Sequence, residues 1–259
     1  MRDLITSFDN KFYKLLKKLD QKKYRDENNI FKAEGEKFLN EDINFNKIIV
    51  KESKFEYFDK KYSIGNHDNL TILRDDLFDE VSTQESSQGI MFLYTKNLNN
   101  ISDINGDVVI LDDIQDPGNI GTIMRTMIAV NFKNLILTKG SVDVYNPKTV
   151  RATMGGIFKL NIIYETPENI IEFLKKNDYL IVSTALHKDS ISYEKIIQKD
   201  KNAYIFGNEG GGVSDYLIEQ SDIKSIIPIY GDIESLNVSV ASGIFLYKMK
   251  EKQEELKNV

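Results

Sequence analysis

Cysteine is absent from the 259-residue sequence, and no apolar run approaches the length of a membrane span. Without cysteine the chain has no disulfide, no thiolate nucleophile and no cysteine-ligated zinc, and it suits a reducing compartment. A helix that crosses a bilayer needs roughly 20 consecutive apolar residues. The first 16 residues carry charges throughout and lack the apolar core of a secretory signal peptide. We therefore expect a cytoplasmic protein that does not bind a membrane.

The charge distribution is uneven, although the net charge is −6. Charged residues make up 29% of the chain and hydrophobic residues 41%, a balance typical of a globular protein with one large or two small domains. An acidic net charge argues mildly against a protein that simply coats nucleic acid. However, residues 11–25 contain six lysines and an arginine against one acid, Asp20, and phosphate contacts depend on local charge. This run is either a solvated helix face or an RNA-binding patch.

Proline and glycine are concentrated in the second part of the chain. All four prolines and most of the glycines lie after residue 106. The tract NLNNISDING at residues 97–106 is polar and rich in turn-forming residues. We therefore expect a first domain at residues 1–98, a linker at 99–106 and a second domain at 107–259.

The first domain is expected to be a small α/β domain. Phe12, Leu15, Leu16 and Leu19 follow the i, i+3, i+4, i+7 spacing of an amphipathic helix. A second helix is expected at residues 33–39. Short apolar runs separated by polar turns lie at residues 47–50, 62–64, 71–73 and 89–94.

The second domain is expected to alternate strands and helices. Strands are expected at residues 107–113, 134–138, 160–164, 179–185, 204–207 and 225–229. Helices are expected at residues 120–130, 147–154, 167–176 and 236–255. Asn146 and Pro147 suit the cap and first turn of the second of these helices. Such alternation predicts a parallel sheet covered by helices on both faces.

Three segments follow expected strands and contain glycine, asparagine, proline or acid: residues 112–125, 206–214 and 228–242. In open parallel sheets, ligands bind beyond the carboxyl ends of the strands. Four of the six residues from Gly207 to Gly212 are glycine, which lets the backbone turn sharply and approach a ligand. The spacing matches neither phosphate-binding glycine motif, and Glu209 would repel phosphate. The loop suits a ligand with hydroxyls, an amine or a positive centre, or it is a tight turn without a ligand.

The other two segments allow both a structural and a functional explanation. Asn119 is expected at a helix cap, and Arg125 follows six residues later in a mostly apolar helix. An unpaired buried charge is costly, so an ion pair of Arg125 with Asp112 or Asp113 would explain the arginine without a function. The third segment places a serine and an asparagine before a helix rich in small residues, and both residue types are good caps.

Three motifs in these segments resemble the signature motifs of the SpoU/TrmH RNA 2′-O-ribose methyltransferases, a family of the SPOUT superfamily. They are D-P-G-N-I-G-T-I-x-R-T at residues 116–126, G-N-E-G-G-G-V-S at 207–214 and I-P-I-x-G-x-x-E-S-L-N-V-S-V-A at 227–241. The segment Y-N-P-K-T-V-R-A-T-M-G-G at 145–156 is similar to another stretch common in that family. The segment K-K-Y-R…F-K-A-E-G at 22–35 resembles the family's N-terminal substrate-binding domain more loosely.

The resemblance implies an α/β fold with a C-terminal parallel-sheet SPOUT domain and a small N-terminal α/β RNA-binding domain. It also implies a deep trefoil knot in the C-terminal domain, which sequence pattern alone does not suggest. The implied methyl donor is S-adenosylmethionine, with no metal. The implied partners are an RNA and a second copy of the chain, with the active site completed near the subunit boundary. The N-terminal domain favours ribosomal (23S) RNA over transfer RNA.

The site residues fall into three groups. The family's catalytic positions correspond to Asn119, Arg125, Glu209, Ser235 and Asn237. Cofactor contacts are expected at Thr184, Leu186, Gly207, Asn208, Gly210, Ile227, Ile229, Leu236 and Ser239. Contacts to RNA phosphates are expected at Lys22, Lys23, Arg25, Lys32, Lys148 and Arg151. The two histidines, at positions 67 and 187, have no acid or second ligand at metal spacing, so we expect no metal site.

The resemblance assigns the central chemical role to Arg125. The methyl group of a sulfonium is already electrophilic, so the hard step is to make the ribose oxygen nucleophilic and to align it. Arg125 is expected to take the 2′-proton or, since an ordinary guanidinium has a pKa of about 12.5 or higher, to stay protonated and stabilise the forming alkoxide. Asn119 is expected to hold the ribose or Arg125, and Glu209 to orient Arg125 or a substrate hydroxyl. Ser235 and Asn237 are expected to orient the target nucleotide.

Two rival interpretations differ in what they require of the sequence. A nicotinamide-dependent dehydrogenase needs G-x-G-x-x-G after the first strand of the second domain, where the sequence reads Q-D-P-G-N-I-G. A non-catalytic RNA-binding module of the same fold does not need Asn119, Arg125 and Glu209, and all three are present.

Overall fold

The chain divides into two compact units in the computed structural model, which describes residues 3–40, 44–97 and 99–257. Unit 1 comprises Met1–Asn97 and Asp143–Phe158, and unit 2 comprises Leu98–Val142 and Lys159–Val259. The expected boundary at residue 98 lies outside the described residues. The division differs from the expected one in one respect, because residues 143–158 pack with unit 1 although the sequence places them within the second domain.

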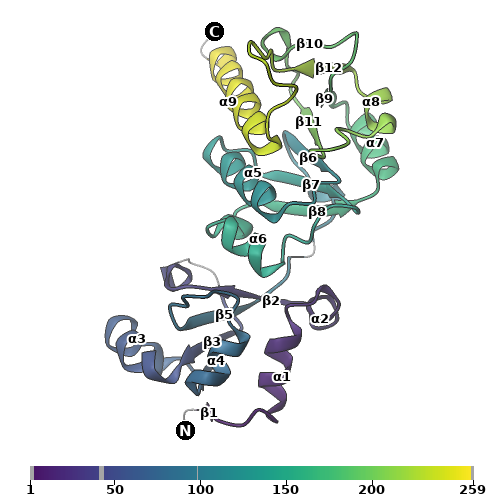
Figure 1. Ribbon diagram of the computed structural model, residues 1–259. Coiled ribbons are helices and arrows are strands. Elements are labelled where there is room, and N and C mark those ends of the chain that lie inside the picture. Colours follow the sequence, from purple (N-terminus) through teal and green to yellow (C-terminus); the bar gives the residue numbers. More distant parts are fainter. Residues whose placement is uncertain (1–2, 41–43, 98, 258–259) are drawn as a thin grey trace. The chain divides into compact units, whose positions relative to one another are not determined.

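Unit 1 contains a mixed five-stranded sheet in the order β1-β4-β3-β5-β2 (Figure 1). Strand β4 pairs in parallel with both β1 and β3, whereas β5 is antiparallel to β3 and β2. The strands are β1 (Asp3–Ile5), β2 (Ile30–Glu34), β3 (Lys47–Lys51), β4 (Leu70–Leu73) and β5 (Ile90–Thr95). The α-helices are α1 (Lys11–Lys18), α2 (Lys22–Asn28), α3 (Phe55–Tyr62), α4 (Asp75–Val81) and α6 (Pro147–Ala152).

The predictions for unit 1 are partly confirmed. The amphipathic helix is α1, and the strands expected at 47–50, 71–73 and 89–94 correspond to β3, β4 and β5. The helix expected at 33–39 is wrong: Ala33 belongs to β2, and Gly35, at φ +127°, ends that strand before a short 3₁₀ turn. The apolar run at 62–64 does not form a strand, because Tyr62 closes α3 and the left-handed Ser63 follows it.

Two apolar layers hold unit 1 together. On one layer α1 and α4 pack against the sheet through residues such as Leu16, Leu77 and Phe78. The other layer is aromatic and contains Tyr94, whose ring centre lies 4.5 Å from that of Phe158. Aromatic pairs at this distance are stabilising beyond their buried area. Because Phe158 closes the segment 143–158, this layer explains why the segment belongs to unit 1.

Unit 2 contains a seven-stranded sheet in the order β10-β12-β9-β11-β6-β7-β8. Each neighbouring pair of strands is parallel, which confirms the predicted parallel sheet. The strands are β6 (Val108–Asp112), β7 (Asn134–Thr138), β8 (Asn161–Glu165), β9 (Leu180–Thr184), β10 (Ile191–Ser192), β11 (Asn202–Gly207) and β12 (Ile223–Ile226). The α-helices are α5 (Pro117–Ala129), α7 (Pro167–Lys176), α8 (Asp215–Glu219) and α9 (Val238–Lys257).

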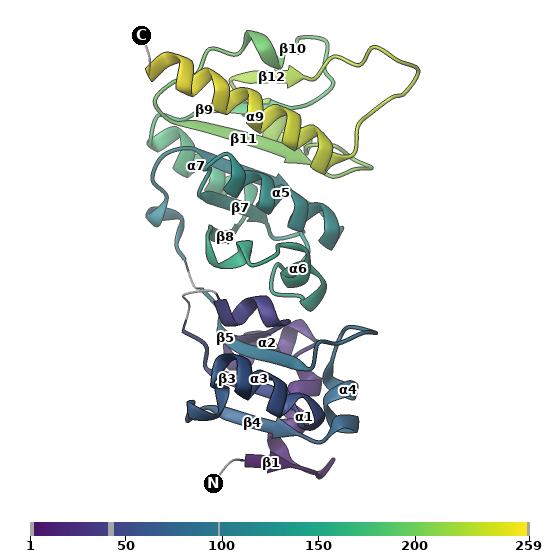
Figure 2. The same cartoon turned by 90° about the vertical axis from the view of Figure 1, so that its left-hand side faces the viewer.

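Helices cover both faces of this sheet. Figures 1 and 2 show α5 and α9 side by side on one face and α7 with α8 on the other. The central strands β6 and β7 are buried along their whole length, as expected for strands enclosed by two helix layers. Among the helices of the described residues, none is both long and apolar enough to cross a membrane.

The last strand ends earlier than predicted. The sequence places it at residues 225–229, whereas β12 stops at Ile226. Residues 227–237 therefore form a long loop between β12 and α9, visible at the upper right of Figure 2. The prediction was wrong because Ile227 and Ile229 extend the apolar pattern while they line a cleft instead of pairing in the sheet.

Candidate active site

A cleft of about 710 Å³ opens at the carboxyl ends of β9, β11 and β12 in unit 2. These strands run in the same direction, with β9 between the other two, so their terminal loops meet at one edge of the sheet. Small-molecule sites typically have a volume of roughly 300–1,000 Å³. The residues that line it are Thr184, Ala185, Leu186, Phe206, Gly207, Asn208, Glu209, Gly210, Gly212, Ser225, Ile226, Ile227, Ile229, Gly231, Ile233, Glu234, Ser235, Leu236, Val238 and Ala241.

The glycine loop after β11 folds back on itself. The N–H of Asn208 donates to the Gly212 carbonyl at 3.0 Å, and the N–H of Gly212 donates to the Asn208 carbonyl at 2.8 Å. The Asn208 side chain fixes the loop further: its Oδ1 accepts the Gly210 N–H at 2.8 Å, and its Nδ2 donates to the Asp113 carbonyl at 2.7 Å. Gly212 has φ +70°, a conformation that favours glycine. The loop is therefore tied both to itself and to the end of β6.

Gly207 stands where no side chain fits. A Cβ atom at this position would lie 2.0 Å from the carbonyl carbon of Gly212 and 2.0 Å from the nitrogen of Val213. Both are backbone atoms, so a rotamer change cannot relieve the overlap. By contrast, a Cβ at Gly211 would meet nothing within 4 Å. The close packing of the returning loop therefore requires glycine at position 207.

Side-chain hydrogen bonds connect the three motif segments. Asn119, on α5, donates through Nδ2 to the carboxylate of Glu209 in the glycine loop. Asn237 donates through its own Nδ2 to Oδ1 of Asn119 at 3.1 Å, and its Oδ1 accepts from the Ser239 hydroxyl at 2.6 Å. Three positions distant in the sequence thus meet beside the cleft.

The structure corrects the expected cap of α5 and gives the expected cap of α9 a second role. Asn119 is not the cap of α5, because Asp116 caps that helix and accepts the Asn119 N–H at 2.8 Å. The Asn119 side chain is therefore free to join the chain of hydrogen bonds. Before α9, Asn237 accepts the Ser239 N–H at 2.9 Å, so one asparagine both supports the helix start and contacts Asn119.

Arg125 does not make the ion pair that the sequence suggests. Asp112 instead accepts the Ser214 N–H at 2.8 Å, which holds the end of the glycine loop. Arg125 lies on α5, is exposed, and within the described residues forms no hydrogen bond or ion pair. It does not line the cleft of its own chain.

The cleft contains most of the positions expected to contact the cofactor. All of these line it except Ser239, which instead bonds to Asn237. Of the expected catalytic positions, Glu209 and Ser235 line the cleft, and Asn119 and Asn237 reach it through Glu209. The cleft is also lined by residues that the sequence did not predict, among them Phe206, Gly231 and Glu234. Phe206 lies near the end of β11, and the other two lie in the loop after β12, so the available signal was their place near or beyond a strand end.

Two of the residues expected to contact RNA phosphates are buried, and those two predictions are wrong. Arg25 is 2% exposed and pairs with Asp143 at 2.7 Å, while its Nη1 donates to the Leu19 carbonyl at 2.7 Å. Lys32 is 4% exposed and pairs with Asp20 at 2.7 Å. Burial lowers the pKa of Lys32, because desolvation disfavours its charged form. Both cations are held inside unit 1.

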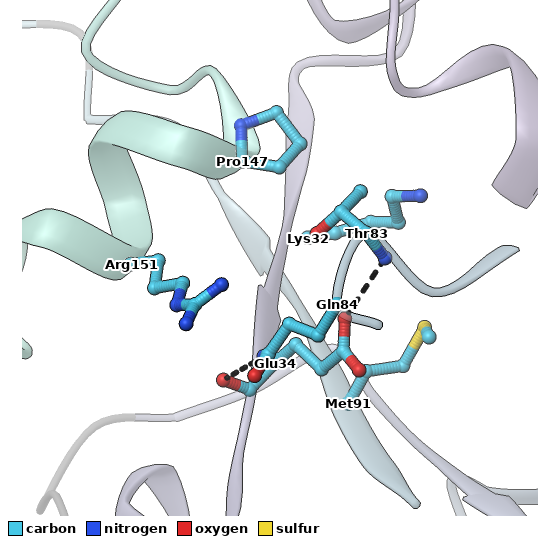
Figure 3. Close-up of a pocket in the computed structure, with 7 residues that line it drawn as sticks. All are labelled: Lys32, Glu34, Thr83, Gln84, Met91, Pro147 and Arg151. Carbon is cyan, nitrogen blue, oxygen red and sulfur yellow. Dashed lines mark hydrogen bonds between the residues drawn. The ribbon is translucent and has the colours of Figure 1, made fainter. Parts of the chain in front are cut away.

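A small cavity beside Lys32 is too tight for a nucleotide. Figure 3 shows it between β2, α6 and the stretch around Thr83 and Gln84, with Arg151 pointing towards it. Its volume is about 10 Å³, which is room for a single water. Glu34 closes one wall by accepting the Thr83 N–H at 3.2 Å. The remaining expected phosphate contacts are exposed at the surface of unit 1: Lys22, Lys23, Lys148 and Arg151.

Comparisons with known proteins agree with this architecture. A family described as "SpoU rRNA Methylase family" matches residues 106–247, and one described as "MRM3-like substrate binding domain" matches residues 10–91. The 23S rRNA (guanosine(2553)-2'-O)-methyltransferase RlmP of Bacillus subtilis is 32% identical over 250 residues, which cover 95% of this chain and 98% of that protein. The 23S rRNA (adenosine(1067)-2'-O)-methyltransferase of Streptomyces azureus is 34% identical over 144 residues, 55% of this chain and 54% of that protein.

A solved structure extends the likeness to three dimensions. The S-adenosylmethionine-bound rRNA methyltransferase from Sinorhizobium meliloti has a TM-score of 0.85 and 27% sequence identity, and the match covers 96% of this chain and 98% of that one. The family match spans more than half of the chain, including the three motif segments that meet at the cleft. Because the family model matches residues 106–247 and a relative is 32% identical over 95% of this chain, the chain belongs to the SpoU rRNA methylase family.

Proposed function

We propose that this protein transfers a methyl group from S-adenosylmethionine to a ribose 2′-hydroxyl of RNA, and that the RNA is 23S ribosomal RNA. The observation that carries the proposal is the cleft at the ends of β9, β11 and β12, closed by the glycine loop. The relative that matches almost the whole chain is named as a 23S rRNA 2′-O-methyltransferase. The matched substrate-binding family in unit 1 supports RNA as the substrate.

The lining of the cleft suits S-adenosylmethionine. Its apolar side chains, Leu186, Ile227 and Leu236, offer surfaces for an adenine ring, while backbone groups around Gly207 offer hydrogen bonds to a ribose. Glu209 brings a negative charge to the same wall, which complements a sulfonium and an amine. The volume of about 710 Å³ matches a nucleoside-sized ligand.

The chain's own residues prepare the acceptor oxygen. The donor, once bound, supplies an electrophilic methyl group, so the protein has to position and activate the 2′-hydroxyl. Asn119 is held between Glu209 and Asn237, so its amide is fixed in place before the nucleotide arrives. In our proposal Ser235 and Asn237 orient the nucleotide, and Arg125 takes the proton or stabilises the forming alkoxide.

Arg125 reaches a cleft, in this proposal, only when two copies of the chain associate. It is exposed and does not line the cleft of its own chain. Helix α9, which packs beside the α5 helix that carries Arg125, has an exposed apolar face formed by Val240, Ile244 and Tyr247. These positions follow the i, i+4, i+7 spacing of one helix face. We propose that this face forms a homodimer in which Arg125 of the partner subunit completes the site.

The strand order also supports the proposed deep trefoil knot in unit 2. Strand β11 lies between β9 and β6, both of which precede it in the chain, and β12 then lies on the far side of β9. In our proposal the chain after β9 reaches this place by passing through the region bounded by earlier elements. In our proposal the loops 207–213 and 227–237 belong to the knotted part.

Replacing Ile244 by glutamate is expected to convert the dimer to a monomer. The substitution places a charge in the centre of the α9 face, where burial without a partner is costly. Analytical ultracentrifugation measures the change, and Lys176→Gln, which lowers the net charge by the same amount on α7 at the other face of the sheet, serves as the control. A wild-type protein that is monomeric at micromolar concentration contradicts the homodimer.

Calorimetric titration with S-adenosylmethionine tests cofactor binding, and mapping of the 2′-O-methyl groups in 23S rRNA tests the reaction. We expect saturable binding to the purified protein and loss of one 2′-O-methyl group from 23S rRNA in cells that lack the gene. Restoring the gene restores the methyl group. Binding of RNA without binding of S-adenosylmethionine would instead identify a non-catalytic RNA-binding module.

A further inference from the structure

A basic groove lies between α1 and α2 in unit 1, apart from the cleft described above. Its volume is about 370 Å³. Its walls are Lys11, Lys14, Leu15, Lys18, Tyr24 and Asn28. The three lysines are spaced i, i+3, i+7 along α1, which places them on one face of that helix. These lysines belong to the basic run at residues 11–25 but are not among the phosphate contacts expected from the sequence.

Most of the acidic groups near this groove pair with cations that do not line it. Glu80 accepts from Lys17 at 2.7 Å, and Asp20 pairs with the buried Lys32. Asp26 pairs with Lys96, which directly follows β5, so the charge of Asp26 is also not available to neutralise the lysines of α1. Lys14 pairs with Asp9 at 2.8 Å. Lys11 and Lys18 have no ion-pair partner within the described residues, so the groove keeps uncompensated positive charge.

Tyr24 gives the groove an aromatic surface. The Nζ atoms of Lys18 and Lys23 lie 5.1 Å and 5.7 Å from the centre of its ring. Both lysines are exposed, so their long side chains can turn away without breaking any buried contact. Asn28 donates to the Tyr24 carbonyl at 2.8 Å, which stabilises the end of α2 beneath the ring. The ring is thus an aromatic surface with exposed lysines around it.

We propose that this groove binds an unpaired nucleotide of the RNA substrate, with its base stacked on Tyr24 and the flanking phosphates on Lys11 and Lys18. The proposal rests on the proposed function, since it assigns RNA as the ligand. At 1.5 Å per residue, Lys11 and Lys18 are about 10 Å apart along the helix axis. Each lysine has a flexible four-carbon side chain, so the two ammonium groups can come closer together and contact the phosphates on either side of one nucleotide.

The combination of a ring and lysines favours single-stranded RNA over other anionic partners. Stacking on an aromatic side chain needs a base that is not enclosed in a duplex, and it tolerates every base. Lysines contact phosphates as point charges and add strength without sequence preference. Lys18 and Lys23, which now lie over the ring, would turn to phosphates when a base takes their place.

Replacing Tyr24 by leucine is expected to weaken binding of a fluorescent single-stranded RNA 12-mer of mixed sequence by about 10-fold, because base stacking is lost. Tyr24→Phe keeps the ring and is expected to bind within about 2-fold of the wild type. Leucine fills much of the same half-buried space, so the fold is retained, and thermal unfolding of both variants checks this. Fluorescence anisotropy gives the affinities for the full-length protein.

The double variant Lys11→Gln/Lys18→Gln is expected to lower the slope of log affinity against log salt concentration by about 1.4, or 0.7 for each phosphate contact with a single strand. Lys60→Gln/Lys176→Gln removes the same charge from α3 and α7, and its slope should equal that of the wild type. In Figure 1, α3 lies on the opposite side of unit 1 from α1 and α2.

Two results would overturn the proposal. One is unchanged RNA affinity in Tyr24→Leu, which would leave at most a phosphate-binding surface without stacking. The other is an equal loss in both double lysine variants, which would make the effect one of net charge. Because each assay measures RNA binding alone, and S-adenosylmethionine binding is measured separately, failure here is distinguishable from failure of the proposed function.

Discussion

Replacing Arg125 by lysine is expected to lower the rate of methyl transfer by about 100-fold or more. Both possible roles of Arg125 depend on the planar guanidinium, which offers several donors in a fixed geometry, whereas the lysine ammonium is a single compact charge. Loss of one preorganised donor to a developing oxyanion typically costs 10²–10³ in rate, roughly 3–4 kcal/mol. The exposed guanidinium makes no hydrogen bond or ion pair within the described residues, so the folded state should lose little stability.

Single-turnover kinetics with saturating RNA and cofactor measure this change separately from binding. Affinity for S-adenosylmethionine is expected to stay within about 3-fold of the wild type, because Arg125 does not line the cleft of its own chain. Arg74→Lys is the matched control, since Arg74 lies in unit 1, where its side chain bonds to the nearby Asp76 and lies over the ring of Phe8. Near-full activity in Arg125→Lys would remove Arg125 from the chemical step.

The parallel sheet could be predicted from the sequence because its strands are enclosed. A strand buried on both faces is a continuous apolar run, and the residues at its carboxyl end mark where the chain turns. The prediction of β7 has the bounds of the structure, as does that of α7, which begins at a proline after the capping residue Thr166. The position of the cleft could be predicted for the same reason, because ligand sites in open parallel sheets lie at the carboxyl ends of the strands.

The burial of Arg25 and Lys32 could not be predicted, because their partners are not local. Arg25 pairs with Asp143, 118 positions away, and Lys32 donates to the carbonyl of Val81 at 2.8 Å. A lysine-rich run has the same appearance in the sequence whether its cations face solvent, phosphates or a buried carboxylate. For Arg25, the packing of residues 143–158 within unit 1 decides between these environments, and for Lys32 the positions of Asp20 and Val81 do so.

The role of Asn119 depended on competition between neighbouring caps. Asp116 and Asn119 are both good cap residues, and Pro117 favours the first helical position. The structure starts α5 at Pro117 with Asp116 as the cap. This start turns the Asn119 side chain towards Glu209 and Asn237, so one local choice places a residue in the candidate site.

Replacing Gly207 by alanine is expected to weaken S-adenosylmethionine binding by at least 100-fold. The new Cβ would lie 2.0 Å from two backbone atoms, in Gly212 and Val213, so the glycine loop has to move. Forcing extra volume into a tightly packed site typically costs about 1–3 kcal/mol and occasionally more. An overlap with two backbone atoms belongs at the upper end, and about 3 kcal/mol corresponds to about 150-fold in affinity. The displaced loop would carry Glu209 away from Asn119 and deform the wall of the cleft. Calorimetry gives the affinity, and thermal unfolding gives the stability.

Gly211→Ala is the control within the same loop, because a Cβ there meets nothing within 4 Å. Its cofactor affinity is expected to stay near that of the wild type. Equal losses of affinity in both variants would contradict close packing at Gly207 as the cause.

Gly207→Ala also separates the two possible locations of Arg125. Coexpressed with Arg125→Ala under a second affinity tag, it yields a mixed dimer. If Arg125 acts on the partner's cleft, one of the two sites in that dimer has an intact cleft and an intact arginine, so about half of the wild-type activity per dimer returns. If Arg125 acts on the cleft of its own chain, neither site is complete, and the mixed dimer is as inactive as its parents.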